Sequence, residues 1–168
     1  MRVANATTFV LLSVICGWMS ACSKGPAEIP PMAAVAATYT LSVAPPECGV
    51  VAQGAGRGGV PTIALQPNGT ADVVELPACY ASFSGRGPTE RLSGSGKWSL
   101  LRDPDGIVGL ELQVGSGGSL PPGAYYSIEL RNRQPPYDLY FGVGDPDNGK
   151  WLVFKSASNN RIERTRER

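Results

Sequence analysis

Apolar and polar residues alternate with a period of two in several short runs between residues 37 and 158. A period of two places successive side chains on opposite faces of a β-strand, so each run predicts a strand with one buried face. The runs 137–143 and 151–155 are aromatic and β-branched, which also favours strands. The alternating apolar positions are Tyr39, Leu41 and Val43; Ile63 and Leu65; Val108, Leu110, Leu112 and Val114; and Tyr126, Ile128 and Leu130.

Turn signals separate these runs. Asn68-Gly69 lies between two of them and predicts a hairpin with a type I′ turn, whose two central residues both need positive φ. Asp103-Pro104-Asp105-Gly106 and Asp145-Pro146-Asp147-Asn148-Gly149 are turn signals of the same kind. The sequence therefore predicts an all-β fold, a single antiparallel meander of about seven or eight strands. It closes as a small barrel or a sandwich, because closure removes exposed strand edges.

The N-terminal segment has the features of a secretory signal. An apolar run over residues 9–19 follows Arg2 and is shorter than the roughly 20 residues that span a bilayer. It leads into Met19-Ser20-Ala21-Cys22, which resembles the bacterial lipobox. The resemblance implies cleavage before Cys22 and acylation of that residue, and more than one acyl chain is needed for a stable anchor. Cleavage at a small-residue site and release as a soluble protein is the alternative.

The resemblance also implies a location in the cell. Ser23 follows the cysteine at the position where Asp would signal retention in the inner membrane. We therefore expect a lipoprotein of the outer membrane that faces the periplasm in a bacterial cell envelope.

The cysteines fit export. With Cys16 in the signal peptide and Cys22 acylated, Cys48 and Cys79 form the one pair left. An exported chain meets an oxidising compartment, so we expect a disulfide between them. Its loop of about 30 residues would stabilise the fold by about 3–4 kcal/mol. A redox or metal-binding pair is the alternative, but neither a C-x-x-C spacing nor a histidine partner supports it.

Four regions follow from these observations. Residues 1–21 are expected to be the lipoprotein signal peptide and 22–36 a flexible tether, since the latter are small, proline-bearing and nearly uncharged. Such a tether would lift the domain off the lipid surface. Residues 37–158 form the β domain. Residues 159–168, with four arginines, two glutamates and almost nothing apolar, are expected to be a disordered charged tail.

Composition narrows the chemistry. The chain has no histidine, which excludes a histidine-dependent triad or zinc site. A net charge of +1 gives no overall attraction to nucleic acid. The G-x-G-x-x-G pattern at 54–59 continues into a strand instead of a helix, so it predicts a loop and no nucleotide site. The acidic turn at 145–149 fails the EF-hand spacing for calcium. We expect no cofactor, no metal and no enzymatic activity.

Three short motifs resemble those of small bacterial envelope lipoproteins with lipocalin-like barrels. They are Ala37-Thr38-Tyr39-Thr40-Leu41, Ile63-Ala64-Leu65-Gln66-Pro67-Asn68-Gly69-Thr70 and Ser95-Gly96-Lys97-Trp98. The likeness covers most of residues 37–155 and implies a barrel. Asn68 replaces the more usual Asp, and the glycine-rich stretch 54–59 is not part of the pattern. Strand and turn motifs support a fold more than an activity, so no functional residue is carried over.

Aromatic residues are the candidate binding groups. Trp98 and Phe141 are expected in the core, whereas Tyr125, Tyr126, Tyr137 and Tyr140 put rings on both strand faces, so some should be exposed and available to a partner. The leading hypothesis is a non-enzymatic envelope accessory factor that binds another protein. The alternative is a lipocalin-like carrier of a small apolar ligand, which needs a cavity inside the barrel.

Overall fold

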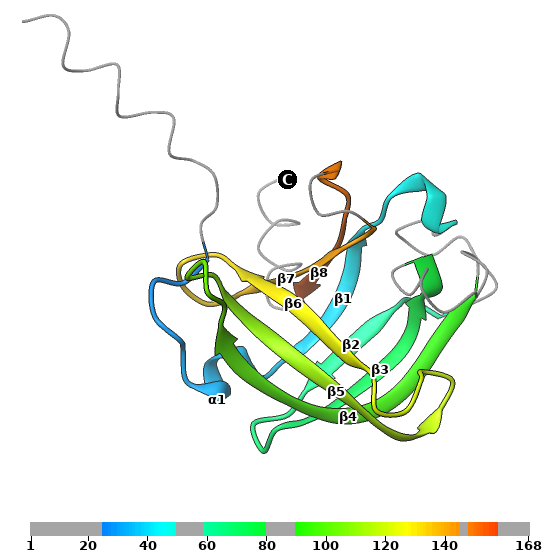
Figure 1. Ribbon diagram of the computed structural model, residues 1–168, viewed down its shortest axis with the longest axis horizontal. Coiled ribbons are helices and arrows are strands. Elements are labelled where there is room, and N and C mark those ends of the chain that lie inside the picture. The colour runs from blue at the N-terminus through cyan, green and yellow to red at the C-terminus, as the bar shows by residue number, and fades with distance from the viewer. Residues whose placement is uncertain (1–24, 50–58, 80–89, 145–147, 158–168) are drawn as a thin grey trace, which may run out of the picture.

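The computed structural model is an eight-stranded antiparallel β-barrel (Figure 1). The structure describes residues 25–49, 59–79, 90–144 and 148–157. Each strand pairs with the next one along the chain, and the last strand pairs with the first. The elements are α1 (Met32–Val35), β1 (Thr38–Val43), the 3-10 helix η2 (Pro46–Cys48), β2 (Thr62–Leu65), β3 (Thr70–Pro77), β4 (Arg91–Arg102), β5 (Val108–Gly118), β6 (Tyr125–Arg131), β7 (Asp138–Gly142) and β8 (Trp151–Ser156).

The predicted antiparallel meander is confirmed, and it closes as a barrel. Leu41 of β1 lies opposite Phe154 of β8, and a register shift between Leu41 and Val43 marks a bulge in β1 at this closing pair. Bulges increase local twist and bend a strand, which helps the sheet to curl. The closing pair satisfies the backbone groups that would otherwise line two free edges.

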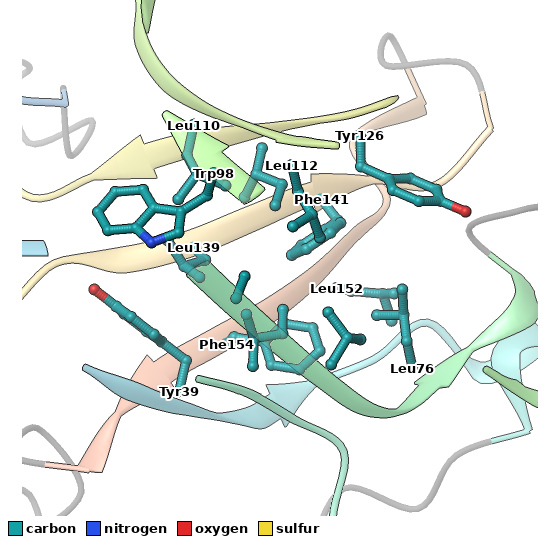
Figure 2. Close-up of a cluster of buried hydrophobic side chains, with 14 of the residues drawn as sticks. Tyr39, Leu76, Trp98, Leu110, Leu112, Tyr126, Leu139, Phe141, Leu152 and Phe154 are labelled. Carbon is teal, nitrogen blue, oxygen red and sulfur yellow. The ribbon is translucent and has the colours of Figure 1, made fainter. Parts of the chain in front are cut away.

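Inward-facing side chains form one hydrophobic cluster inside the barrel (Figure 2). The buried face predicted for residues 108–114 is confirmed, since Val108, Leu110, Leu112 and Val114 are all buried, and Gly109 is the one alternate position that is buried as well. Trp98 and Phe141 are buried as expected. The rings of Phe141 and Phe154 pack with their centroids 5.4 Å apart, and Trp98 Nε1 donates a hydrogen bond to the Gln66 carbonyl at 2.9 Å. The core therefore buries its largest ring without leaving the ring nitrogen unsatisfied.

Two of the predicted hairpins are confirmed, but the type I′ turn predicted at Asn68-Gly69 is wrong. Gly69 N–H donates to the Gln66 carbonyl, and Gly106 N–H donates to the Asp103 carbonyl, each at 3.0 Å. Both glycines have φ +84°, whereas Asn68 and Asp105 before them have negative φ, since Glu75 and Asn132 are the only non-glycine residues with positive φ in the described part of the chain. The reason is the preceding proline, which fixes negative φ at the first central position. A type I turn followed by a left-handed glycine results. The third turn signal, at 145–149, lies mostly outside the described residues.

The barrel has two ends of different construction. We call the first the strap end; it carries the turns 66–69 and 103–107 and the connection 132–137. We call the second the disulfide end; it carries the connections 44–61, 78–90, 119–124 and 143–150. The short connections thus lie at the strap end, and the longest ones lie at the disulfide end.

Residues 25–36, which we call the strap, cross the first end (Figure 1). They belong to the segment expected as a tether, and the structure packs them against the barrel. Val35 of α1 is fully buried in the core cluster, and Tyr39 Oη donates to its carbonyl at 2.6 Å. Arg102 Nη2 donates to the Ala27 carbonyl at 2.7 Å. The small residues that suggested a flexible segment instead let the chain lie close to the ends of the strands.

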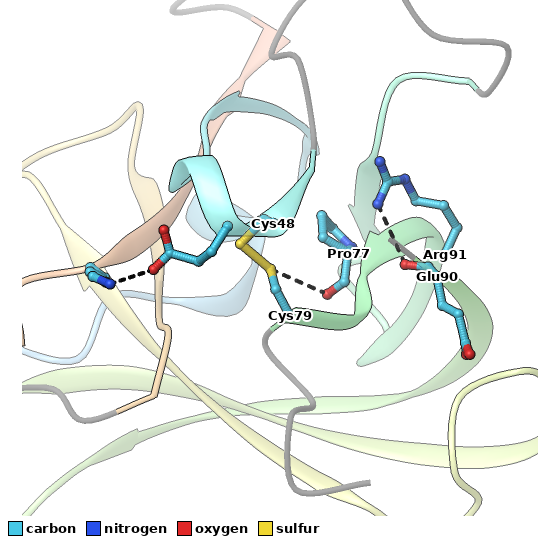
Figure 3. Close-up of a disulfide and its surroundings, with 7 residues drawn as sticks. Cys48, Pro77, Cys79, Glu90 and Arg91 are labelled. Atoms are coloured by element: carbon cyan, nitrogen blue, oxygen red, sulfur yellow. Dashed lines mark hydrogen bonds and ion pairs between the residues drawn. A yellow bond between two sulfur atoms is a disulfide. The ribbon is translucent and has the colours of Figure 1, made fainter. Parts of the chain in front are cut away.

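The predicted disulfide between Cys48 and Cys79 is confirmed (Figure 3). It joins η2, in the β1–β2 connection, to the residues that follow β3, with the two Cα atoms 5.1 Å apart. Cys48 is fully buried and Cys79 is almost so. Beside it, Lys150 Nζ forms an ion pair with Glu47 at 2.6 Å, which connects the β7–β8 connection to η2. The disulfide end is therefore held together across three of its connections.

Candidate functional site

An aromatic and charged cluster lies on the outer wall of β6, β7 and β8. It consists of Glu129, Arg131, Tyr140 and Trp151, which we call the outer cluster. The alternation of each strand determines this position, because Leu130, Leu139 and Leu152, the sequence neighbours of these residues, are fully buried in the core. Glu129 lies opposite Tyr140 in the β6–β7 register, and the β7–β8 register brings Trp151 opposite Gly142.

The guanidinium group of Arg131 is the centre of the outer cluster. Its Nε and Nη2 atoms donate to the two carboxylate oxygens of Glu129, both at 2.9 Å. The same group lies 4.5 Å from the ring centroid of Tyr140 and 5.2 Å from that of Trp151, within the range of a cation–π interaction. The Arg131 side chain is 27% exposed and that of Glu129 is 20% exposed. The ion pair and the rings hold the guanidinium in one orientation on an accessible surface.

The indole of Trp151 lies over Gly142 on the neighbouring strand. A Cβ atom at Gly142 would lie 3.6 Å from the Trp151 ring, so the indole covers the glycine on the neighbouring strand. Trp151 also meets Tyr140 in an edge-to-face arrangement, with centroids 6.1 Å apart and planes inclined by 65°. Edge-to-face pairs are a favoured aromatic geometry. The outer cluster is therefore a packed surface unit that spans three strands.

The four tyrosines expected as binding groups lie in different environments. Tyr125 is 59% exposed, and Gln113 Nε2 donates to its hydroxyl at 2.6 Å. Tyr126 and Tyr137 are buried in the core cluster, and Tyr140 belongs to the outer cluster. Tyr125 and Tyr140 are thus the two with surface rings. They do not form one patch, since Tyr125 begins β6 at the disulfide end and Tyr140 pairs with Glu129 further along that strand.

Sequence reasoning missed Glu129, Arg131 and Trp151 as members of a site. The alternation around Ile128 and Leu130 already placed Glu129 and Arg131 on the outer face of one strand. It could not show which residues of β7 and β8 would lie beside them, because that depends on the register between strands.

Two titratable groups have shifted pKa values. Burial raises the pKa of Tyr39 strongly, and the charge of Asp138 and the nearby Tyr137 add to that increase. The hydrogen bond from Lys150 lowers the pKa of the exposed Glu47 carboxyl. Neither group belongs to the outer cluster. Both shifts follow from ordinary burial and ion pairing, and neither indicates a catalytic acid or base.

Several residues that the sequence analysis considered as sites lie outside the described part of the chain. Cys22, Gly54–Gly58 of the glycine-rich stretch and Asp145 and Asp147 lie outside the described residues. Within the described ranges, no group of three or more cysteine, aspartate or glutamate side chains is arranged to hold a metal ion. The same part of the chain contains no helix that is long and apolar enough to cross a membrane.

Comparisons with family models, with curated proteins and with solved structures found no match to this chain.

Proposed function

We propose that this chain is a lipid-anchored protein of the bacterial outer membrane, facing the periplasm, that binds another envelope protein without catalysing a reaction. Acyl groups on Cys22 would provide the anchor, and the outer cluster would provide the binding surface. The proposal places the chain with the small envelope lipoproteins that have lipocalin-like barrels, which its strand and turn motifs resemble. The outer cluster is the observation that carries the binding role.

The anchor is supported by the chain's chemistry on both sides of Cys22. Before it lie one positive charge and an apolar segment that ends in small residues, as in a secretory signal. After it, the domain carries a disulfide between Cys48 and Cys79. Disulfides persist in oxidising compartments such as the periplasm. The disulfide of the folded domain is therefore consistent with the periplasmic location that the N-terminal segment indicates.

The large side chains inside the barrel favour binding on its outside. Small eight-stranded barrels either fill with side chains or hold one small ligand. Here the core cluster includes Trp98, Phe141 and Phe154, all buried. A carrier would need space where these rings lie. A protein partner needs only the outer surface, which supports this role over that of a carrier.

The outer cluster has the composition of a binding hot spot. Trp, Tyr and Arg are enriched at protein interfaces and account for much of their binding energy. Arg131 is already fixed by Glu129 and by two rings, so it loses little side-chain freedom when a partner binds. Its carboxylate partner also means that the patch carries no net charge. The partner surface that fits is apolar or aromatic.

Crosslinking in intact cells tests the binding role. Full-length wild-type protein, Tyr140→Ala, Trp151→Ala and the control Tyr125→Ala would be expressed at equal levels, crosslinked and purified. Removing a hot-spot residue typically costs about 2 kcal/mol or more of binding energy, so we expect at least tenfold less of the same partner with the two cluster variants. Tyr125→Ala should retain it, because it changes an exposed tyrosine away from the cluster. Thermal unfolding of each variant checks that the fold is intact.

Two results would contradict the binding role. The first is that Trp151→Ala and Tyr140→Ala capture as much of the partner as wild type, which would show that the outer cluster is not the binding surface. The second is an absence of any specific partner together with an apolar small molecule that co-purifies with the native protein by mass spectrometry. That second result would establish the carrier role instead.

Labelling with palmitate tests the anchor separately. Wild-type protein should incorporate the label and partition into the outer-membrane fraction, and Cys22→Ala should do neither. If Cys22→Ala keeps both label and membrane location, the lipoprotein assignment is wrong.

A further inference from the structure

The strap connects the predicted anchor to one particular end of the barrel. A Cβ atom at Gly25 would lie 2.5 Å from the Leu130 carbonyl oxygen, so the backbone at Gly25 closely approaches the end of β6. Arg102, at the end of β4, binds the Ala27 carbonyl. Further along the strap, the Met32 side chain lies beside Gly69 in the β2–β3 turn, where a Cβ atom would be 3.5 Å from it. Every one of these contacts is at the strap end.

The packed strap leaves very little chain for a tether. Cys22 precedes Gly25 by three residues, and fully extended chain spans at most about 3.6 Å per residue, or roughly 11 Å here. A free segment from residue 22 to residue 36 would instead reach about 50 Å. An acyl anchor on Cys22 would therefore hold the strap end next to the lipid and could not lift the domain far from it.

The strap end also presents apolar side chains. Ile29 is 48% exposed and Ile107 is 43% exposed. Arg102 links the two chain segments that carry them, because its Nη1 donates to the carbonyl of Gly106, next to Ile107, and its Nη2 to the carbonyl of Ala27, two residues before Ile29, each at 2.7 Å. Single exposed isoleucines are common on protein surfaces. What distinguishes this pair is its place beside the chain segment that leads to the anchor.

Charge does not attract this end to an anionic membrane. The strap and the connections of the strap end carry Glu28, Asp103 and Asp105 against Arg133 and the neighbouring Arg102, whereas lipid recognition by charge needs a cluster of about four to eight basic residues. Contact would depend on apolar insertion and on the high effective concentration that a short linker gives. It should therefore change little with salt.

We infer that the strap end is a lipid-contacting surface, on which Ile29 and Ile107 enter the headgroup region of the membrane that the anchor occupies. This inference rests on the proposed acylation of Cys22. The disulfide end then points away from the lipid into the periplasm. The outer cluster lies on the barrel wall between the two ends and stays accessible to a partner.

Site-specific fluorescent probes test the orientation. The disulfide and the acylated Cys22 leave no free thiol, so Ile107→Cys at the strap end and Tyr125→Cys at the disulfide end each provide a single labelling site. The full-length acylated proteins would be placed in phosphatidylethanolamine–phosphatidylglycerol vesicles that contain a shallow lipid quencher. We expect at least threefold stronger quenching at residue 107 than at residue 125, in low and in high salt. Equal quenching, or stronger quenching at residue 125, would overturn the inference.

A longer linker provides the matched control. A Gly/Ser-rich insertion of about twelve residues between Lys24 and Gly25 adds an average reach of about 20 Å. The protein should stay membrane-bound while quenching at residue 107 falls several-fold. Hydrogen exchange of the unlabelled protein should show vesicle-dependent protection at 103–107 and none at 119–124. Protection at neither turn would contradict the inference without relying on any probe.

The results separate the two proposals. If Cys22→Ala remains acylated or membrane-bound, the anchor is wrong. If the wild type is acylated and membrane-bound but residue 107 is quenched no more than residue 125, the anchor stands and the orientation is wrong.

Discussion

The two ends of this barrel are closed by different means. At the strap end, short turns are stabilised by their own proline, asparagine or aspartate, and glycine residues. The strap, which contains no disulfide, packs beside them through Val35, whose carbonyl accepts a hydrogen bond from Tyr39. At the disulfide end, the connections 44–61 and 78–90 are long, and the bond between Cys48 and Cys79 joins them. Longer connections lose more conformational entropy when their ends are fixed. A disulfide at this end therefore offsets a larger entropic cost of folding. Local chemistry is sufficient where the turns are short.

The largest expected effect comes from removing the crosslink. The Cys48→Ala/Cys79→Ala variant should lose about 3–4 kcal/mol of unfolding free energy, because the 31-residue separation is no longer constrained in the unfolded chain. Urea denaturation monitored by circular dichroism measures the loss. Wild-type protein unfolded in the presence of a reductant should show a similar decrease. A denaturation midpoint equal to that of the oxidised wild type would mean that the disulfide end is stabilised by its packing alone.

A smaller effect is expected from weakening the strap. Val35→Ala should cost about 2 kcal/mol, since it deletes two buried methyl groups from the core. Ile29→Ala in the same segment is the control and should change stability by no more than about 0.5 kcal/mol, because its side chain is about half exposed. Chemical denaturation of both variants gives the comparison. Equal and small effects would show that the strap is not part of the folded core, and would also remove the basis for the short anchor.

The smallest effect should come from the hydroxyl of Tyr39. Tyr39→Phe removes its hydrogen bond to the Val35 carbonyl and should cost about 1 kcal/mol at neutral pH. The raised pKa of Tyr39 means that the folded state holds the phenol proton more tightly than the unfolded state. This stabilisation is fully present below the unfolded pKa of about 10 and is lost as pH rises beyond it.

The stability difference between wild type and Tyr39→Phe should therefore disappear near pH 11, at a rate of about 1.4 kcal/mol per pH unit above pH 10. Denaturation of both proteins between pH 8 and pH 11 measures this difference directly. A difference that stays constant across this range would show that Tyr39 ionises as easily in the fold as in the unfolded chain.

The fold could be predicted to a large extent because its strands and turns are local features. Period two identified the buried face of residues 108–114 and of residues 126–130. The Pro-Asn-Gly and Pro-Asp-Gly sequences identified two hairpins, although the proline before each pair fixed a different turn type from the one expected. The disulfide was predictable by elimination, since only two cysteines remain once Cys16 and Cys22 are assigned to the predicted signal and anchor.

The candidate site was harder to predict because it is assembled across strands. Tyr126 and Tyr137 were expected as binding groups alongside Tyr125 and Tyr140, but both are buried. The alternation of Tyr126 with Ile128 and Leu130 already indicated that Tyr126 faces the core, whereas no alternating pattern placed Tyr137. Trp151 becomes part of the outer cluster only because the β7–β8 register places it over Gly142.

By itself, the sequence determined the strands, the faces of most of them, two hairpins and the cysteine pair, because each depends on residues that are neighbours in the chain or on a count of one residue type. Only the tertiary structure decided that the sheet closes as a barrel, that residues 25–36 cross one end of it, and that Glu129, Arg131, Tyr140 and Trp151 meet on its outer wall. These features depend on strand register and on packing between distant segments. Residues that are small and proline-bearing can extend as a tether or pack as a strap, and the difference lies in the surface they meet.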